Sequence, residues 1–415
     1  MQIDSSLFLD RFLSYVAYDT QSSEQSDTYP STLKQLELSK QLLLELKELG
    51  LEQVEITEHG YVFGTLPATV SHAVPTIGYV AHVDTSPEVS GKEVKPVINR
   101  NYQGGDIHLK NDPDQVIEFD QNPALAACIG HDIITTDGTT LLGADNKAGV
   151  AEIMGAVKYM IDHPEIEHGT IRVAFTVDEE VGTGTEHFDV KQFAADYAYT
   201  IDGETVGEIE DETFCADTAI IRVKGVNVHP GYAKNKMVNG IKIAARIIDQ
   251  LPPDRMSPET TEKREGYLHP HAVKGGVEET EIVLLVRDFD VDGLKEKETY
   301  LADLCKATEK KYPKSTITLE IKESYRNMKL VLDQHAEVVS YAMDAVERAG
   351  LKPIKNLIRG GTDGARLCFM GVPTPNIFTG GHNFHSKKEW ISVQDMAGAV
   401  ATIVHLSQIW AEKSK

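Results

Sequence analysis

Near-continuous apolar runs that end abruptly in polar residues are the most regular feature of the chain. The run from Ile171 to Val177, IRVAFTV, is followed by three acids, Asp178, Glu179 and Glu180. Unbroken hydrophobicity of this length, rich in β-branched and aromatic residues, predicts a strand of a parallel sheet that helices cover on both faces. Ligands bind such sheets at the carboxyl ends of the strands, which is where the acids fall. Taken alone, the three acids would also suit a solvated turn.

The same pattern occurs three more times along the chain. The strand-like run TIGYVAHVD ends in His82 and Asp84, the Gly-rich segment GADNKAG places Asp145 directly before a helix, and the run YAYTIDGE reaches Asp202. We expect these polar residues to meet at one edge of a sheet. The Gly-rich segment could instead be only a tight connection between a strand and a helix.

Helical spacing of apolar residues predicts several helices in the first half of the chain. Residues 5–17 and 31–50 both show it. In the second of these segments we expect one buried face, formed by Leu33, Leu36, Leu43, Leu46 and Leu49. A further helix, which begins just after Asp145 and runs to about residue 162, is expected to bury Val150, Ile153, Met154 and Val157. Residues 85–142 are rich in turn residues and are expected to leave the sheet.

The middle of the chain has a different character. The strands TAIIRVKGV, EIVLLVRDFD and STITLEIKES alternate with helices near residues 239–250 and 292–310, which predicts an α+β module with mainly antiparallel strands. The first pattern resumes near residue 325, with helices near 334–349 and 393–411. We therefore expect an α/β protein with a mostly parallel sheet flanked by helices, built from residues 1–208 and 324–415 and interrupted by an inserted domain over 209–323.

Composition and charge narrow the possible partners and the compartment. The chain has 415 residues, of which 41% are apolar and 25% are charged, as in an ordinary soluble globular protein. Its net charge of −23 argues against nucleic acid or an anionic membrane surface as a partner, because both require basic patches. Four widely separated cysteines and the lack of a signal peptide or membrane span favour a cytoplasmic location.

Seven polar residues at the strand ends and near the C-terminus are candidates for a metal site. Histidine nitrogen and carboxylate oxygen are ligands of zinc, and this number of them suits a pair of ions bridged by one carboxylate and a water. The seven also concentrate negative charge that bound cations would balance. Each residue alone has an ordinary structural interpretation, such as a buried core histidine or an Asp-Gly turn. The set is His82, Asp84, Asp145, Glu179, Glu180, Asp202 and His385.

Eight segments that occur in order resemble motifs of one known family, the M20 metallopeptidases. These segments are AHVDTSP, TTDGTTLLGADNKAG, FTVDEEVG, TIDGE, NVHPGYAKNKMVNG, RDFD, IRGGTDGARL and GHNFHSKKEW, which extend from near residue 80 to near residue 390. The resemblance implies a zinc-peptidase-like fold with two Zn2+ ions per subunit. It implies that His82 and Asp202 bind one zinc, that Glu180 and His385 bind the other, and that Asp145 bridges them.

The resemblance also implies roles for the remaining groups. Glu179 would be the catalytic general base, and Asp84 would be the catalytic acid residue that orients His82. A cis peptide bond would follow the bridging residue, between Asp145 and Asn146, where the family often has a second Asp in place of Asn146. The inserted domain would be a lid and dimerisation domain in a homodimer. Within it, His229 and Arg287 would contact the substrate.

The expected activity is release of the N-terminal residue from short peptides by a two-zinc aminopeptidase. Tripeptides are expected as substrates on the resemblance alone. One alternative is another M20 hydrolase, such as a dipeptidase or an N-acyl amino acid hydrolase. Another is a peptide-binding protein on the same fold that has no catalytic activity, although such a protein would not need Glu179 and Asp84. The remaining histidine pair, His269 and His271, is expected in a solvated loop of the inserted domain rather than in a site.

Overall fold

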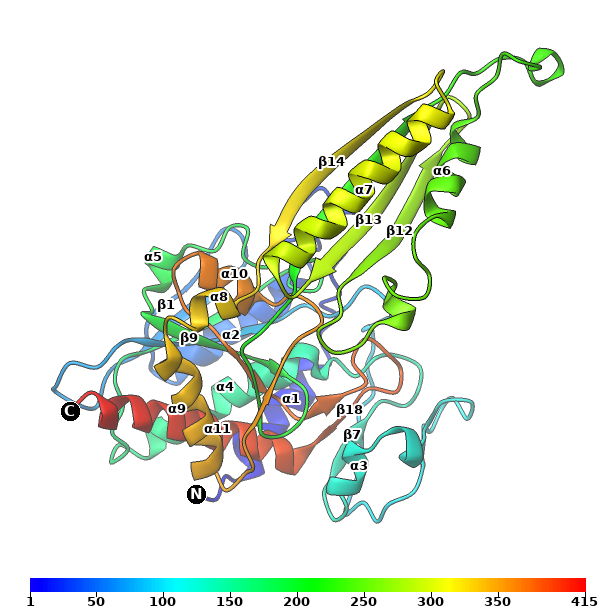
Figure 1. The fold of residues 1–415 in the computed structure, drawn as a ribbon. Helices are drawn as coiled ribbons and strands as arrows, with labels where there is room; N and C mark the ends of the chain where they lie inside the picture. Colours follow the sequence, from blue (N-terminus) through cyan, green and yellow to red (C-terminus); the bar gives the residue numbers. More distant parts are fainter. The chain divides into compact units, whose positions relative to one another are not determined.

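The computed structural model describes all residues of the chain, Met1–Lys415, and divides them into two compact units (Figure 1). The first unit contains residues 1–211, 331–356 and 362–415, and the second contains residues 212–330 and 357–361. The first unit is therefore discontinuous in sequence.

An eight-stranded mixed sheet organises the first unit, in the order β1-β2-β8-β3-β9-β16-β10-β15. The central strands β8, β3, β9 and β16 are parallel to one another, while β1 and β2 add an antiparallel edge. The predicted α/β class with a largely parallel sheet is confirmed. The strands are β1 (Glu52–Ile56), β2 (Val62–Leu66), β3 (Ile77–His82), β8 (Ile171–Thr176), β9 (Tyr197–Gly203), β10 (Glu208–Glu210), β15 (Ile354–Asn356) and β16 (Asn376–Phe378).

Helices pack on this sheet and on one another. The long helix α4 lies against β3, β9 and α11, which explains why most of its residues are buried. The four apolar residues predicted to form its buried face are among them. Helix α2 packs on β1 and β2. The helices of this unit are η1 (Ser5–Leu7), α1 (Leu9–Tyr15), α2 (Gln35–Glu48), η2 (Phe119–Gln121), α3 (Ala124–Ala127), α4 (Ala144–Asp162), α5 (Val190–Phe193), α9 (Ala336–Arg348), α10 (Asp363–Phe369) and α11 (Val393–Lys413). None of the helices is long and apolar enough to cross a membrane.

The buried face of α2 differs from the predicted one. Leu38, Leu42 and Leu46 are fully buried, whereas Leu33 precedes the helix and is 70% exposed. Residues four apart lie one turn above another on the same side of a helix, so the Leu38–Leu42–Leu46 row forms the contact with the sheet. Of the predicted row only Leu46 is buried, because that row combined residues from two sides of the helix.

The segment between β3 and α4 leaves the main sheet, as expected. It contributes two strands to a small sheet of order β17-β18-β7-β4 and forms a separate two-stranded ribbon. Helix α3 and the short helix η2 belong to the same excursion. The strands are β4 (Val97–Asn99), β7 (Ile133–Thr135), β17 (Gly381–His382), β18 (Trp390–Ser392), β5 (Ile107–His108) and β6 (Val116–Ile117).

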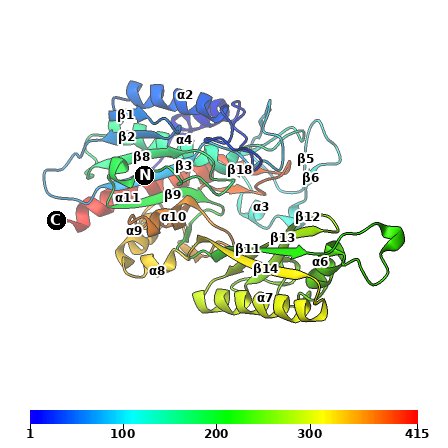
Figure 2. The same cartoon turned by 90° about the horizontal axis from the view of Figure 1, so that it is seen from above.

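The second unit is an antiparallel four-stranded sheet of order β12-β13-β11-β14 with two helices. Both helices cover the same face of the sheet (Figure 2), and Ile221, Ile282, Leu284 and Leu301 belong to the apolar core of this unit. Its elements are β11 (Cys215–Lys224), η3 (Pro230–Tyr232), α6 (Gly240–Asp249), η4 (Pro258–Thr260), β12 (Tyr267–Gly275), β13 (Glu279–Asp288), α7 (Val291–Lys311) and β14 (Thr316–Tyr325). Helix α8 (Lys329–Leu332) lies at the sequence boundary between the units.

Strand β12 corrects one expectation, because it contains His269 and His271, which were expected in a loop. Pro270 hid the strand, since proline within a run argues against a central strand. The register of β12 shifts between Pro270 and Ala272, and the strand lies at the sheet edge, where proline is tolerated. The two rings lie 6.0 Å apart and no carboxylate joins them in a cluster of metal-binding groups.

Candidate metal centre

Three neighbouring parallel strands bring most of the predicted site residues to one edge of the main sheet. His82 is the last residue of β3, Asp202 lies near the end of β9, and Glu179 and Glu180 follow β8. Register pairs His82 with Thr176 of β8, so the carboxyl ends of these strands are level. The parallel pairing that the apolar runs predict thus places the polar residues together.

The first group of ligand atoms surrounds the Nε2 atom of His82. Nε2 lies 3.1 Å from Asp145 Oδ1 and 3.3 Å from Asp202 Oδ1, while Glu179 Oε2 is farther, at 3.9 Å. On the other side of the ring, Nδ1 lies 3.0 Å from the main-chain oxygen of Asp84. A proton on Nδ1 would donate to that oxygen, which would leave Nε2 free to bind a metal ion.

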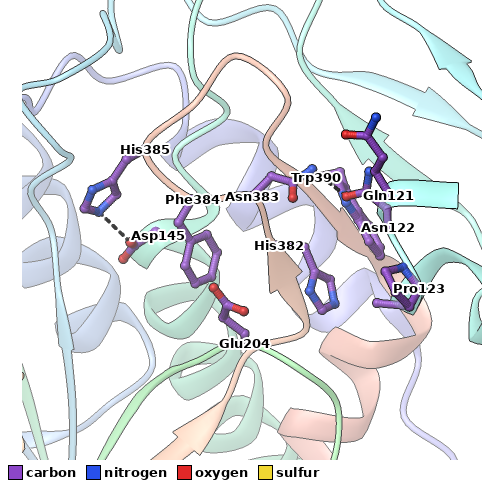
Figure 3. Close-up of a pocket in the computed structure, with 11 residues that line it drawn as sticks. Gln121, Asn122, Pro123, Asp145, Glu204, His382, Asn383, Phe384, His385 and Trp390 are labelled. Atoms are coloured by element: carbon purple, nitrogen blue, oxygen red, sulfur yellow. Dashed lines mark hydrogen bonds and ion pairs between the residues drawn. The ribbon is translucent and has the colours of Figure 1, made fainter. Parts of the chain in front are cut away.

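The second group surrounds His385 in the loop between β17 and β18. His385 Nε2 lies 2.8 Å from Glu180 Oε2 and 3.2 Å from Asp145 Oδ2, and Figure 3 shows the contact between His385 and Asp145. The two oxygens of Asp145 therefore face two different histidines. Asp145 also precedes the cis peptide bond to Asn146 that the resemblance implies.

Asp84 holds the turn that carries both glutamates. Its carboxylate accepts hydrogen bonds from the main-chain N–H of Glu179 at 3.1 Å and of Glu180 at 3.2 Å. Oδ1 of Asp84 also lies 3.4 Å from His82 Nδ1, and the side chain is fully buried. Asp84 thus contacts elements that carry ligands from both groups.

The electrostatics of the site call for cations. Burial raises the pKa of Glu180 to about 8, and the charge of Asp145 adds to this effect. Burial also raises the pKa of Glu179 well above the usual carboxyl range, with Asp202, Asp363 and Glu180 adding to it against the opposing effect of His82. The pKa of His385 is raised to about 11, because its contacts with Asp145 and Glu180 outweigh burial. The positive charge of two imidazoles thus balances only part of the negative charge that five buried or half-buried carboxylates can carry.

The donor set fits two divalent metal ions. Two groups, His82–Asp145–Glu180 and His82–Glu179–Asp202, each have ligand atoms within 4.8 Å of one another. Glu180 Oε1 is buried and has no hydrogen-bond partner. A buried carboxylate oxygen without a donor is costly, and a metal ion would satisfy it. Imidazole nitrogen and carboxylate oxygen are the donors found in catalytic zinc sites.

A cavity of about 530 Å³ adjoins this centre within the first unit. Asp145 and His385 lie on its wall together with Phe384, Glu204 and Asn122 (Figure 3). It is large enough for a small peptide in contact with the candidate metal ligands.

The sequence motifs contain further residues whose roles the structure reveals. Asp178, the first acid after β8, has a φ of 58° and is fully buried. Its carboxylate accepts hydrogen bonds from the main-chain N–H of Ser31 and from Gln35 Nε2, the latter at 2.6 Å. Asp178 therefore fixes the 31–35 segment and is not a metal ligand. Asp363, also buried, accepts from Thr176 Oγ1 at 2.8 Å beneath the same turn. Asp178 directly follows the apolar run of β8, and Asp363 lies in the Gly-rich segment IRGGTDGARL, and neither pattern distinguishes a structural acid from a metal ligand.

The two remaining predicted site residues, His229 and Arg287, belong to the second unit. His229 is the N-cap residue just before η3, and its Nδ1 accepts from Gly231 N–H at 3.1 Å. Arg287 lies on β13 and donates to the main-chain oxygen of Asp217 at 3.0 Å. Their proposed contacts with substrate remain predictions.

Comparison with known proteins assigns the chain to a family. Residues 137–408 match the model of peptidase family M20/M25/M40. The chain belongs to this family, which confirms the resemblance of its motifs and identifies it as a peptidase-family hydrolase.

The relatives carry a more particular name. A protein named Peptidase T from Caldanaerobacter subterraneus is 49% identical over 405 residues, which is 98% of this chain and 99% of the relative. Peptidase T of Desulfitobacterium hafniense is 50% identical over 98% of both chains.

Solved structures agree with this assignment. The crystal structure of aminopeptidase PepT from Bacillus cereus has a TM-score of 0.76 and 26% identity, and covers 99% of both chains. A Staphylococcus aureus tripeptidase, 22% identical, has the same fold, with a TM-score of 0.77 over 99% of this chain and 100% of the other.

Proposed function

We propose that this protein is a two-zinc aminopeptidase that releases the N-terminal residue of tripeptides. The observation that carries the proposal is the position of Asp145, whose two oxygens lie 3.1 Å from His82 Nε2 and 3.2 Å from His385 Nε2. A carboxylate shared between two histidine-containing groups suits a bridge between two ions. The aminopeptidase and tripeptidase names of the structural neighbours support the substrate class.

The residues divide into two ligand sets with one bridge. His82 and Asp202 would hold one ion, Glu180 and His385 the other, and Asp145 both. When bound, the ions would supply Lewis-acid polarisation of the scissile carbonyl and would make a water acidic at neutral pH. Zinc is proposed because histidine nitrogen and carboxylate oxygen are its usual catalytic ligands.

Glu179 would move the proton. Its carboxylate lies near the ligands but farther from His82 than Asp145 and Asp202 do, which leaves it free to accept a proton from the attacking water. It would then deliver that proton to the nitrogen of the leaving dipeptide. Asp84 would keep both His82 and the turn of Glu179 in place through the contacts described above.

A peptide panel tests the activity and its substrate class. The zinc-loaded enzyme would receive a dipeptide, a tripeptide and a tetrapeptide of the same residues, and the tripeptide with an acetylated N-terminus, with products identified by mass spectrometry. We expect fastest cleavage of the free tripeptide into its first residue and a dipeptide. Faster cleavage of the dipeptide or of the acetylated peptide would contradict the proposal and favour another M20 activity.

We further propose that the inserted domain, residues 209–323, acts as a lid and pairs with its copy in a homodimer. His229 and Arg287 would contact substrate, with His229 stabilising the developing oxyanion in the partner's site. The edge strands β12 and β14 support pairing, because an edge strand leaves main-chain groups available to a second sheet.

Mixed dimers test this arrangement. Inactive His229→Ala protein combined with inactive Glu179→Ala protein would produce some dimers with one site made of two intact halves. We expect partial recovery of activity, and no recovery despite demonstrated subunit exchange would exclude a contribution in trans.

The cellular location is also a proposal. The four cysteines are buried and unpaired, which suits a reducing cytoplasm. Short peptides would be the partners there, rather than nucleic acid or membranes.

A further inference from the structure

The backbone of α4 does not determine the position of Asp145. Although Asp145 lies in the first turn of that helix, its φ of −85° and ψ of 102° are not helical, and Asn146 is not helical either. Gly143, just before the helix, has a left-handed φ of 80°. The first N–H groups of any helix have no partner within it, so other groups must satisfy those of this irregular segment.

One buried side chain from a distant part of the chain satisfies the main-chain donors of this segment. Glu389 Oε2 accepts from the N–H of Leu142 at 2.6 Å and of Gly143 at 2.7 Å, and Oε1 accepts from the N–H of Asp145 at 3.0 Å. The residue is 1% exposed. Three N–H groups that point at one carboxylate form a strong charge-assisted arrangement.

Glu389 is itself held firmly. It directly precedes β18, where Trp390 pairs with Thr135 of β7 and with His382 of β17. The side chain thus joins a short sheet, built partly from the loop of His385, to the segment of Asp145. His385 and Asp145, whose side chains meet at 3.2 Å, are therefore both positioned by the region around β18.

We infer that Glu389 is a positioning residue of the metal centre, which holds the 142–145 segment so that Asp145 can face both ligand groups. This inference rests on the proposed bridging role of Asp145. Glu389 itself touches neither substrate nor metal ligand side chain in this scheme. It acts through main-chain N–H groups, so its hydrogen bond to residue 142 does not depend on the side chain at that position.

Glu389→Gln is the appropriate perturbation, because the amide keeps the size of the side chain. One of its two terminal atoms becomes an NH₂ group, which cannot accept from the N–H that it faces. Glu210→Gln is the matched control: Glu210 is also a buried carboxylate of the first unit, but its Oε2 accepts from Asn376 Nδ2 at 2.7 Å, outside the metal centre.

Amide hydrogen exchange of the metal-free protein is the first readout. We expect the N–H groups of Leu142, Gly143 and Asp145 to be protected in the wild type and in Glu210→Gln, and to exchange at least about tenfold faster in Glu389→Gln. If the Gln variant fails to fold, amide exchange in the wild-type protein still tests the inference. Unprotected amides at these three positions in the folded wild type would overturn the inference.

Metal affinity is the second readout, measured by competition with a chelator. Loss of a group that orients a ligand typically weakens metal binding by about 10–100-fold, and we expect this for Glu389→Gln but not for Glu210→Gln. Unchanged affinity in Glu389→Gln would also overturn the inference. Failure of the wild type to cleave tripeptides would instead contradict the proposed function, since neither readout depends on peptidase activity.

Discussion

Replacing Glu179 with alanine separates proton transfer from metal binding. Glu179 Oε2 lies 3.9 Å from His82 Nε2, whereas Asp145 and Asp202 approach the same atom to 3.1 and 3.3 Å. The main-chain N–H groups of residues 179 and 180, which Asp84 binds, remain in the variant. The turn that presents Glu180 should therefore keep its conformation, and both ions should stay bound.

The expected loss of activity follows from the proton transfers that Glu179 performs. A positioned general acid or base contributes a factor of about 10² to 10⁴ in rate. At about 1.4 kcal/mol per tenfold change, this is about 3–5 kcal/mol of activation free energy. Because Glu179 would act both as base and as acid in one turnover, we expect kcat to fall by at least about 10³-fold. Stability should not fall, since the change removes a buried acid from among other acids.

The assay pairs activity with metal content. Glu179→Ala and Glu180→Ala would be dialysed against zinc-free buffer, and zinc per subunit and kcat on a tripeptide would be measured for both and for the wild type. We expect two zinc equivalents in the wild type and in Glu179→Ala, and one fewer in Glu180→Ala. Loss of an equivalent from Glu179→Ala, with both retained in Glu180→Ala, would show that the two residues have exchanged roles and refute this reasoning.

Three further predictions concern stability. Chelation of the metal should abolish activity until zinc is returned and should lower Tm, because ligands that bind only the folded state stabilise it by about 4 kcal/mol at a thousand times Kd; an unchanged Tm would count against tightly bound ions. Leu46→Ala should cost about 2–5 kcal/mol of unfolding free energy in urea, whereas Leu33→Ala should cost less than about 0.5 kcal/mol, since only Leu46 is buried; equal costs would contradict the α2 face described above. Burial lowers the pKa of His382 to about 4, below the value of about 6.5 in the unfolded chain. As pH falls, the unfolded state therefore takes up the proton first, and the folded protein loses stability between about pH 6.5 and pH 4. The metal-free wild type should therefore lose about 2 kcal/mol more than His382→Phe between pH 7 and pH 5, and equal losses would show that His382 is not the responsible group.

The parallel core and its polar edge could be predicted from the sequence because one physical constraint determines both. Strand β3 and strand β8 are buried at every residue, and the sequence shows this directly as unbroken apolar runs. Once the strands are parallel neighbours, the first polar residues after each run must lie at the same edge. His82, Asp202 and the two glutamates are therefore brought together by strand pairing, with little dependence on loop conformation.

Elements whose burial depends on their neighbours were harder to predict. The predicted face of α2 was wrong except for Leu46, because leucines occur around much of that helix. Only its contact with β1 and β2 selects the Leu38–Leu42–Leu46 row. Strand β12 was missed because it is an edge strand with Pro270 inside it and exposed residues along much of its length. Neither apolar periodicity nor turn residues distinguish such a strand from a loop.

The polar contacts that support the metal centre leave no periodic signal at all. Glu389 meets the main chain of Leu142, Gly143 and Asp145 across roughly 245 residues of sequence, and its partners are N–H groups that every residue except proline possesses. No pattern of side chains can reveal such a contact, because one partner is not a side chain. It depends instead on where β18 places Glu389, and β18 depends on pairing with β7 and β17. The ligand set was therefore visible as residue types at strand ends, while the group that orients the bridging ligand required the tertiary structure.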